Sequence, residues 1–434
     1  MRSGRFFFGA ALALASAGAA DARQLTAGAG KADMTPAASA FPYVVPREKP
    51  FVGVHDPLFA RALVLEDGST RVVLVSIDAT SLIGADQIVA AVAAAAEVPP
   101  QNVIVTVTHT HNNPLVFWHG QTSNPAQPAM IAQLRQAAID AVRTAMAARR
   151  PARIAFARTR AYANVNNGEE AGLKTWADPE GSSDKSLDLV RVTDLAGKPL
   201  AMMVNYATHG EVMYRAVTKD GGYEVSGDLP GAVSALLESQ LGGAPVVLFT
   251  PAAEADQLSL FKAVQPQAQL PATDIGADGW GLLELLARRI ATAALDAAAA
   301  AKPDDAKAQI RIASGALTCP GQKFNVERPS GKVLGIEAAP DVTINVNVIR
   351  IGDLALVGIG ADIASDIGVA VKAAAAARQT TLVTMTGQSA GYVLNDKAYR
   401  KPGHGALGSA IKPGCAPARL PGLVAGLVGE RGAP

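Results

Sequence analysis

The sequence predicts an α/β fold in which helices cover a β-sheet. Short apolar runs are typical of buried strands, and they alternate along the chain with stretches of helical composition. This alternation is the pattern of an α/β architecture. The expected strands are residues 71–77, 103–107, 200–204, 246–249, 354–357 and 381–385. The expected helices are residues 86–96, 131–148, 231–240, 280–301 and 363–377.

Length and composition narrow the class of protein. A chain of 434 residues suits one large or two medium domains. Hydrophobic residues make up 49% and charged residues 18%, a globular balance that excludes a disordered chain. The net charge of +1 and the aromatic content of 5% argue against nucleic acid as the main partner.

The first residues have the pattern of a secretory signal peptide. Residues 1–5 are basic, residues 6–17 are apolar, and residues 18–22 are small. The apolar run is shorter than the roughly 20 residues that a membrane-spanning helix needs. We expect a signal peptide over residues 1–22 and a mature chain, without an integral membrane segment, that is periplasmic or secreted. An uncleaved anchor is the alternative.

The two cysteines lie in sequence typical of loops. Cys319 and Cys415 are the only cysteines, and both are surrounded by proline and glycine. In an oxidising compartment two cysteines can pair, so export favours a disulfide. Two free thiols are the alternative.

Polar side chains follow several of the expected strands, at the point where each strand ends. His109 and His111 follow residues 103–107, and His209 follows residues 200–204. Other strand ends are followed by Asp256 and Asp362. Sites in α/β folds are built at the carboxyl ends of strands. Side chains two residues apart share a face of an extended chain, so His109 and His111 suit one metal or acid–base site. A structural, hydrogen-bonded role is the alternative for each histidine.

Several blocks of the sequence resemble the neutral/alkaline non-lysosomal ceramidase family. The most specific is residues 108–114 (Thr-His-Thr-His-Asn-Asn-Pro), which is similar to the family's Ser-His-Thr-His-Ser-Gly-Pro. The other blocks are residues 30–36, 54–65, 205–210 and 226–231. The resemblance runs in order from about Gly30 to Ala406. It implies a single catalytic domain over residues 23–434, with mixed sheets flanked by helices and without the family's C-terminal immunoglobulin-like domain.

The resemblance also implies a zinc site. The family binds one zinc ion through two histidines, a glutamate and a tyrosine, and the matching histidines are His109 and His209. Asp362 stands in the place of the glutamate, and His404 in the place of the tyrosine. Three imidazoles and one carboxylate are a competent set for Zn²⁺ or another divalent ion. For His404, a solvated loop histidine is the alternative.

Two departures from the family pattern concern its catalytic residues. Asp256 matches the family's aspartate, but Leu258 stands where the family has a serine, and Ser259 follows one residue late. The family's arginine has no match near Asn167. Both departures weigh against cleavage of ceramide itself.

What the resemblance still implies is a metal-hydrolase core. His111 and Asp256 are the candidates for proton transfer or for orienting the substrate. Tyr392 is the candidate for donating a hydrogen bond to the developing oxyanion.

We therefore expect an exported, zinc-dependent amidase or esterase of sphingolipid or related metabolism. Its substrate would be an N-acyl lipid or another small acyl compound, and a metal-activated water would cleave the bond. A non-catalytic relative that binds a lipid or carbohydrate is the alternative. Leu258 and the missing arginine favour this alternative, and the four metal-compatible residues favour the enzyme.

Overall fold

The computed structural model describes residues 24–45, 48–114, 126–170, 174–265, 273–301, 308–327, 332–375 and 379–429. The predicted signal peptide lies outside these residues. No helix among those described is long and apolar enough to cross a membrane.

A bent eight-stranded mixed sheet forms the larger part of the molecule, with the strand order β12-β10-β9-β6-β1-β3-β4-β5. Two neighbouring pairs, β4 with β5 and β10 with β12, are parallel, and the other neighbours are antiparallel. The strands are β1 (Thr26–Asp33), β3 (Phe59–Glu66), β4 (Arg71–Ile77), β5 (Val103–Val107), β6 (Arg150–Arg160), β9 (Ser186–Asp194), β10 (Pro199–Tyr206) and β12 (Val246–Pro251).

A second, four-stranded sheet follows in the C-terminal part of the chain. Its order is β16 (Ile310–Glu327), β17 (Lys332–Ile351), β18 (Leu354–Ile359) and β20 (Gln379–Val383), and only β18 and β20 are parallel. Four smaller sheets complete the described part of the fold. They pair β2 (Phe51–Val54) with β11 (Tyr223–Val225), β7 (Asn164–Glu170) with β8 (Lys174–Asp178) and β13 (Gln257–Ser259), β14 (Val264–Gln265) with β15 (Thr273–Asp274), and β19 (Asp362–Ile363) with β21 (Tyr392–Val393).

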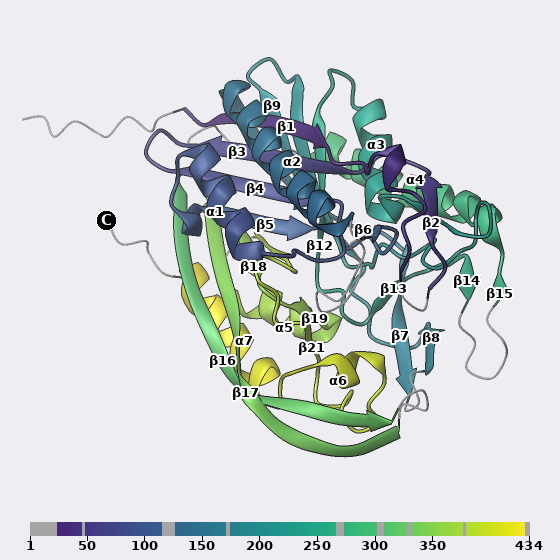
Figure 1. Cartoon of the computed structure of the whole chain (residues 1–434). Helices are drawn as coiled ribbons and strands as arrows, with labels where there is room; N and C mark the ends of the chain where they lie inside the picture. The colour runs from purple at the N-terminus through teal and green to yellow at the C-terminus, as the bar shows by residue number, and fades with distance from the viewer. Residues whose placement is uncertain are drawn as a thin grey trace, which may run out of the picture.

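Helices cover the outer faces of both large sheets. The α-helices are α1 (Ala85–Ala96), α2 (Gln127–Ala147), α3 (Asp228–Gln240), α4 (Gly279–Ala300), α5 (Ser365–Ala374), α6 (His404–Gly408) and α7 (Cys415–Gly429). Short 3₁₀ turns are η1 (Ala38–Ala40), η2 (Pro100–Asn102) and η5 (Gly276–Asp278). Figure 1 shows α1 and α2 together over the strands β1, β3, β4 and β5, and the long curved hairpin of β16 and β17 along the edge that carries α7. The predicted α/β class with mixed sheets flanked by helices is confirmed.

The core lies in layers on either side of the strands, because strand side chains alternate between faces. In β4, Val73 and Val75 pack into the cluster beneath α1 and α2. The intervening Val72 and Leu74 pack against the second sheet, where they join Leu356 of β18. Both faces of β4 are therefore buried, which explains why its sequence is apolar at nearly every position.

A disulfide joins the second sheet to the C-terminal helix. Cys319 of β16 and Cys415 of α7 are bonded, with their Cα atoms 5.8 Å apart. The predicted pairing is confirmed, and the alternative of two free thiols is wrong. The bond holds α7 beside the cluster that Leu420 and Val424 help to form.

The larger sheet bends so that its two edges approach each other. The hydroxyl of Ser76 in β4 donates a hydrogen bond to the carbonyl of Phe249 in β12. Beyond the ends of β5 and β10, Thr110 and Gly210 form an isolated parallel bridge. The carboxyl ends of strands from both edges therefore meet in one place.

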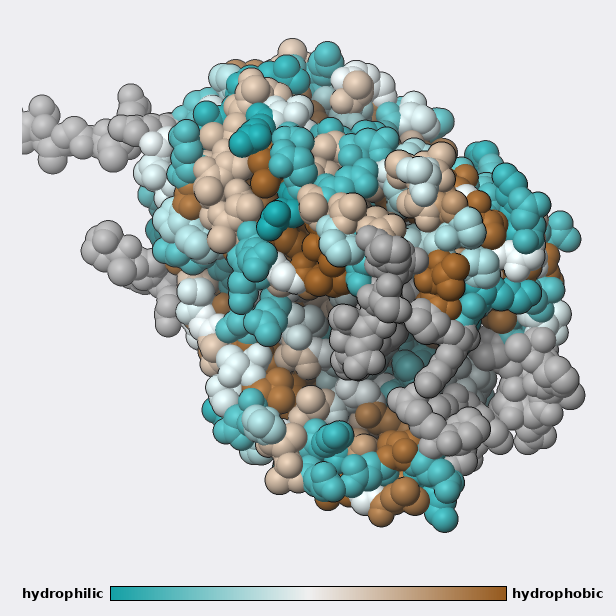
Figure 2. Space-filling view, viewed as in Figure 1, coloured by the Kyte–Doolittle hydropathy of each residue, from teal (hydrophilic) through white to brown (hydrophobic). Residues whose placement is uncertain are grey.

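Figure 2 shows the surface of the molecule from the same side as Figure 1. Hydrophilic and hydrophobic residues are interspersed over this face.

Candidate metal centre

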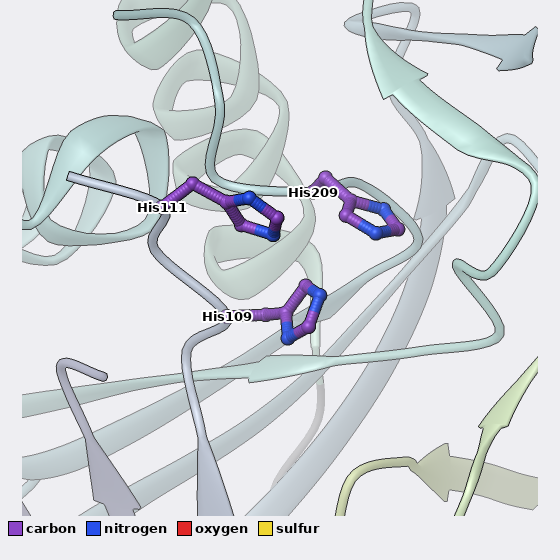
Figure 3. A group of neighbouring side chains, drawn as sticks. All are labelled: His109, His111 and His209. Carbon is purple, nitrogen blue, oxygen red and sulfur yellow. The ribbon is translucent and has the colours of Figure 1, made fainter. Parts of the chain in front are cut away.

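Three histidines meet where the carboxyl ends of β5 and β10 come together. The rings of His109, His111 and His209 converge (Figure 3), and one ligand atom from each lies within 4.8 Å of the others. All three residues are buried. His109 and His111 come from the loop after β5, and His209 comes from the loop after β10. Within the described part of the chain, this is the group whose spacing could hold a metal ion.

Backbone carbonyls hold two of the three rings in a fixed orientation. Nδ1 of His109 lies 2.8 Å from the carbonyl oxygen of Thr80, and Nδ1 of His209 lies 3.0 Å from that of Gln257. A carbonyl oxygen only accepts, so each Nδ1 carries the proton and each Nε2 presents a lone pair. Metal-binding histidines are commonly oriented in this way.

Burial keeps the imidazoles neutral, which is the form that binds a metal. It holds the pKa of His109 and of His111 well below the usual value, and the neighbouring histidines add to the effect. Burial also lowers the pKa of His209. A ring cluster of this kind would be unfavourable if the rings were charged.

The backbone of His109 differs from the extended chain expected from the sequence. The strand ends at Val107, and His109 has φ of +59°, a left-handed conformation that is uncommon for residues other than glycine. His109 and His111 still reach the same site, with their ring centroids 4.9 Å apart. Unusual backbone conformations of this kind often occur at functional sites.

Asp362 brings a carboxylate to the edge of the histidine group. Its Oδ2 lies 3.8 Å from Nε2 of His209. Burial raises the pKa of Asp362 well above its usual value, and the nearby Asp256 contributes. Asp362 lies in β19, where it pairs in register with Tyr392 of β21. The structure therefore brings the predicted ligands His109 and His209 together and places a third, Asp362, next to His209.

The fourth predicted ligand, His404, lies outside the histidine group. It is the first residue of α6 and is exposed, with its ring centroid 6.0 Å from that of Tyr392. It is still close enough for its charge to be among those that lower the pKa of His111. A metal-binding role for His404 stays a prediction.

The other predicted catalytic residues lie beside these groups: His111 and Tyr392 are buried, and Asp256 is half-buried. Oδ1 of Asp256 accepts hydrogen bonds from the backbone N–H of Ser365 at 2.8 Å and from Nε2 of Gln257 at 2.9 Å. Its Oδ2 accepts from Oγ of Ser365 at 3.0 Å and from Nδ2 of Asn166 at 3.2 Å. Asp256 therefore ties β13 to the beginning of α5, an arrangement better suited to orienting neighbours than to moving a proton.

Tyr392 remains a neutral phenol that can donate a hydrogen bond. Its burial raises the pKa of the hydroxyl well above the usual range, and the charge of Asp362 adds to this effect. Tyr392 pairs with Asp362 on the neighbouring strand and therefore lies at the edge of the candidate metal site.

Two buried carboxylates near the histidines were missed from the sequence. Glu254 is 0% exposed and follows β12, so its position at a strand end was an available signal. Glu211 follows His209 closely and forms an ion pair with Lys262, with Oε2 and Nζ 2.8 Å apart. The ring of Tyr214 packs edge-on against His111, with centroids 5.1 Å apart.

The position of the expected serine has a structural role here. Leu258 is buried, and Oγ of Ser259 donates a hydrogen bond to the backbone carbonyl of His209 at 2.8 Å. Ser259 thus supports the loop that carries a candidate ligand.

Comparison with known proteins assigns the family. Residues 25–253, more than half of the chain, match the family described as neutral/alkaline non-lysosomal ceramidase, N-terminal. The chain belongs to this ceramidase family. No curated protein matches the chain.

Solved structures of ceramidases share the fold. One, described as a ceramidase complexed with C2, superposes with a TM-score of 0.72 at 16% identity, over 94% of this chain and 75% of the other. The neutral ceramidase from Pseudomonas aeruginosa gives a TM-score of 0.69 at 16% identity, over 94% and 74% of the two chains. At this identity the likeness is one of fold.

The residues of the site fit a metal ion. Nε2 of His109, both ring nitrogens of His111 and Oδ1 of Asp362 are buried and have no hydrogen-bond partner within the described ranges. Buried polar atoms are rarely left in this state. Imidazole nitrogens with a carboxylate oxygen suit zinc and several other first-row divalent ions.

Proposed function

We propose that this chain is an exported, metal-dependent hydrolase that cleaves the amide or ester bond of an N-acyl lipid or a related acyl compound. The observation that carries the proposal is the group of three buried, neutral histidines beside Asp362, in a chain of the ceramidase family. Zinc is the ion that we propose for the site.

The ligands that we assign are His109, His209 and Asp362. Both histidines have Nδ1 fixed by a backbone carbonyl, which leaves Nε2 aimed into the site. A divalent ion held there would acidify a bound water and polarise the acyl carbonyl.

His111 is the residue that we propose to transfer a proton. Neither of its ring nitrogens has a hydrogen-bond partner among the described residues, and burial keeps the ring neutral. A neutral imidazole can accept a proton at one ring nitrogen and later return it to the leaving group. Tyr214 packs edge-on against this ring and limits its movement.

Tyr392 and Asp256 complete the proposed machinery in supporting roles. The neutral hydroxyl of Tyr392 can donate a hydrogen bond to the substrate oxygen that gains negative charge. Asp256 orients the beginning of α5 through its bonds to Ser365. The hydroxyl of Ser259 donates a hydrogen bond to the carbonyl of His209 and is therefore engaged in supporting the loop. We propose water, and not this serine, as the nucleophile.

A second candidate is a non-catalytic relative that binds a lipid or carbohydrate in the same place. It is favoured by the buried Leu258 at the position where the family has a serine. Such a protein would need no hydrolytic water.

The test is the metal content of the purified mature protein and of a His109→Ala/His209→Ala variant. We expect close to one zinc ion per chain in the native protein and its loss in the variant. A screen of amide and ester substrates should show activity only in the native protein. The matched control is His55→Ala, since His55 is exposed and stacks on Trp280 with ring centroids 3.5 Å apart.

The outcomes separate the two candidates. A native protein that takes up no metal after zinc is added would refute the hydrolase proposal and favour the binding protein. N-terminal sequencing of the protein recovered from the periplasm or medium would test export, with a start near Arg23 expected.

A further inference from the structure

Glu254 is a completely buried carboxylate whose two oxygens have no partner. It is 0% exposed, and neither Oε1 nor Oε2 forms a hydrogen bond or ion pair with any residue that the structure describes. Buried carboxylates are normally paired, hydrogen-bonded or bound to a metal. An uncompensated carboxylate in the interior therefore points to a ligand.

The backbone of Glu254 lies between two of the assigned metal ligands. Its carbonyl accepts the backbone N–H of Gln257 at 2.7 Å, and the carbonyl of Gln257 accepts both the backbone N–H and Nδ1 of His209. On the other side, the backbone N–H of Ala255 donates to the carbonyl of Ile363 at 3.1 Å, next to Asp362 in the chain. The side chain of Glu254 thus begins between His209 and Asp362.

The nearby charges leave Glu254 and Asp362 as two carboxylates without a cation. Burial raises the pKa of Glu254, and the negative charges of Asp362 and Glu211, which lie near it, add to this effect. Glu211 is already neutralised by Lys262 at 2.8 Å. No lysine or arginine in the described part of the chain forms an ion pair with Glu254 or Asp362.

We propose that Glu254 supplies the second carboxylate of the metal centre, beside Asp362. This inference rests on the proposed metal-dependent function. Two carboxylates and neutral imidazoles balance the double positive charge of a divalent ion, whereas Asp362 alone would leave a net charge buried in the interior. Burying an uncompensated charge is costly, so the balanced site binds a divalent ion more tightly.

The experiment is a calorimetric titration of the metal-stripped full chain with Zn²⁺, comparing the native protein with Glu254→Gln. We expect the variant to bind Zn²⁺ at least about tenfold more weakly, since even residues that only support metal ligands change affinity by about 10–100-fold. The matched control is Glu169→Gln, the same change at a carboxylate whose hydrogen bonds come from Asn167 and Gly405 and not from the three histidines. Its affinity should equal that of the native protein.

Thermal unfolding without metal is the second readout. Glu254→Gln removes a buried carboxylate that lacks a partner, so the metal-free variant should melt no lower than the metal-free native protein. Zn²⁺ should then raise its melting temperature less than it raises that of the native protein. If the variant does not fold, Glu254→Asp keeps the charge with a shorter reach and should bind with intermediate affinity.

Equal Zn²⁺ affinity of the native protein and a folded Glu254→Gln variant would overturn this inference and leave the proposed function standing. Absence of Zn²⁺ binding in the native protein would overturn both. Weakened binding in the variant together with native affinity in Glu169→Gln is the supporting result.

Discussion

Gly210 is the position where a small change should disturb the metal centre most directly. It forms the bridge between the two histidine loops, since its N–H donates to the carbonyl of His109 at 3.3 Å and its carbonyl accepts the N–H of His111 at 2.7 Å. In Gly210→Ala, the added Cβ would lie 2.9 Å from Cα of Thr110 and 3.0 Å from Cδ of Pro230. Cα of Thr110 is a backbone atom and Cδ of Pro230 belongs to a rigid ring, so neither atom can turn aside. The two loops must therefore separate.

The required movement can be worked out from these distances. Ordinary van der Waals contact begins at 3.4 Å, so the loops that carry His109 and His209 must move apart by about 0.5 Å. Working sites tolerate displacements of about 0.5 Å, and a displacement of 1 Å can lower the rate about 100-fold. We expect Gly210→Ala to weaken Zn²⁺ binding and to lower the hydrolytic rate by roughly tenfold.

Calorimetric Zn²⁺ titration and initial rates on a short acyl amide would measure these effects. The matched control is Gly231→Ala, because a Cβ at Gly231 in α3 meets only Oδ1 of Asp56, at 4.0 Å. This control should keep native metal binding and gain up to about 1 kcal/mol of stability from alanine in a helix. A folded Gly210→Ala variant with native affinity and rate would refute the reasoning that the close approach of the two loops positions the ligands.

Two further predictions concern stability. The disulfide spans 96 residues of sequence, and in the chain-entropy account a loop of about 100 residues corresponds to about 4.7 kcal/mol. The Cys319→Ala/Cys415→Ala variant should therefore lose several kcal/mol of unfolding free energy in a denaturant titration, and an unchanged midpoint would contradict this. Burial raises the pKa of Glu169 from 4.5 to about 7, so the unfolded state gives up this proton first, and the unfolding free energy falls as the pH rises from about 4.5 to about 7. The unfolding free energy should fall by about 3 kcal/mol between pH 4 and 8 through this group, and Glu169→Gln should lack that part of the pH dependence; parallel pH profiles would refute the assignment.

Four of the eight strands of the larger sheet, β4, β5, β10 and β12, were predicted from the sequence, whereas β1, β3, β6 and β9 were not. The predicted limits of residues 71–77 and 103–107 equal those of β4 and β5, because a strand buried on both faces is a continuous apolar run with polar ends. The helix predicted over residues 363–377 instead begins at Ser365, because Asp362–Ile363 forms β19 and pairs with β21. That pairing joins distant parts of the chain, and no local pattern contains it.

The long hairpin of β16 and β17 shows more strongly that a local sequence pattern cannot predict strand pairing. Gly315, Pro320 and Gly321 interrupt any strand pattern in residues 310–327, yet these residues form one strand. The strand exists because β17 pairs with it along its whole length, with a register shift between Cys319 and Gly321 that accommodates the proline. Propensity is a weak guide where a partner strand supplies the hydrogen bonds.

The residues of the candidate site could be predicted where they directly follow a strand. They could not be predicted where the burial of a side chain depends on packing between segments that are distant in the sequence. His109 and His209 follow predicted strands, although it is the bending of the sheet that brings the ends of β5 and β10 together. Glu254 is one of several polar residues after β12, and its burial depends on packing between distant segments, such as the backbone hydrogen bond from Ala255 to Ile363 of β19. For His404, spacing along the chain says nothing of whether the ring turns inward.

The unpartnered atoms at this site are the physical reason to place a metal there. An unsatisfied buried polar group costs about 1–3 kcal/mol, and a charged one costs more. Among the described residues, Nε2 of His109, both ring nitrogens of His111 and the carboxylate oxygens of Glu254 are in this state within one small region. The left-handed backbone of His109 adds strain at the same point. A fold that concentrates such costs in one place gains stability from any ligand that satisfies them together, and a divalent cation is the species that can bind neutral imidazoles and carboxylates at once.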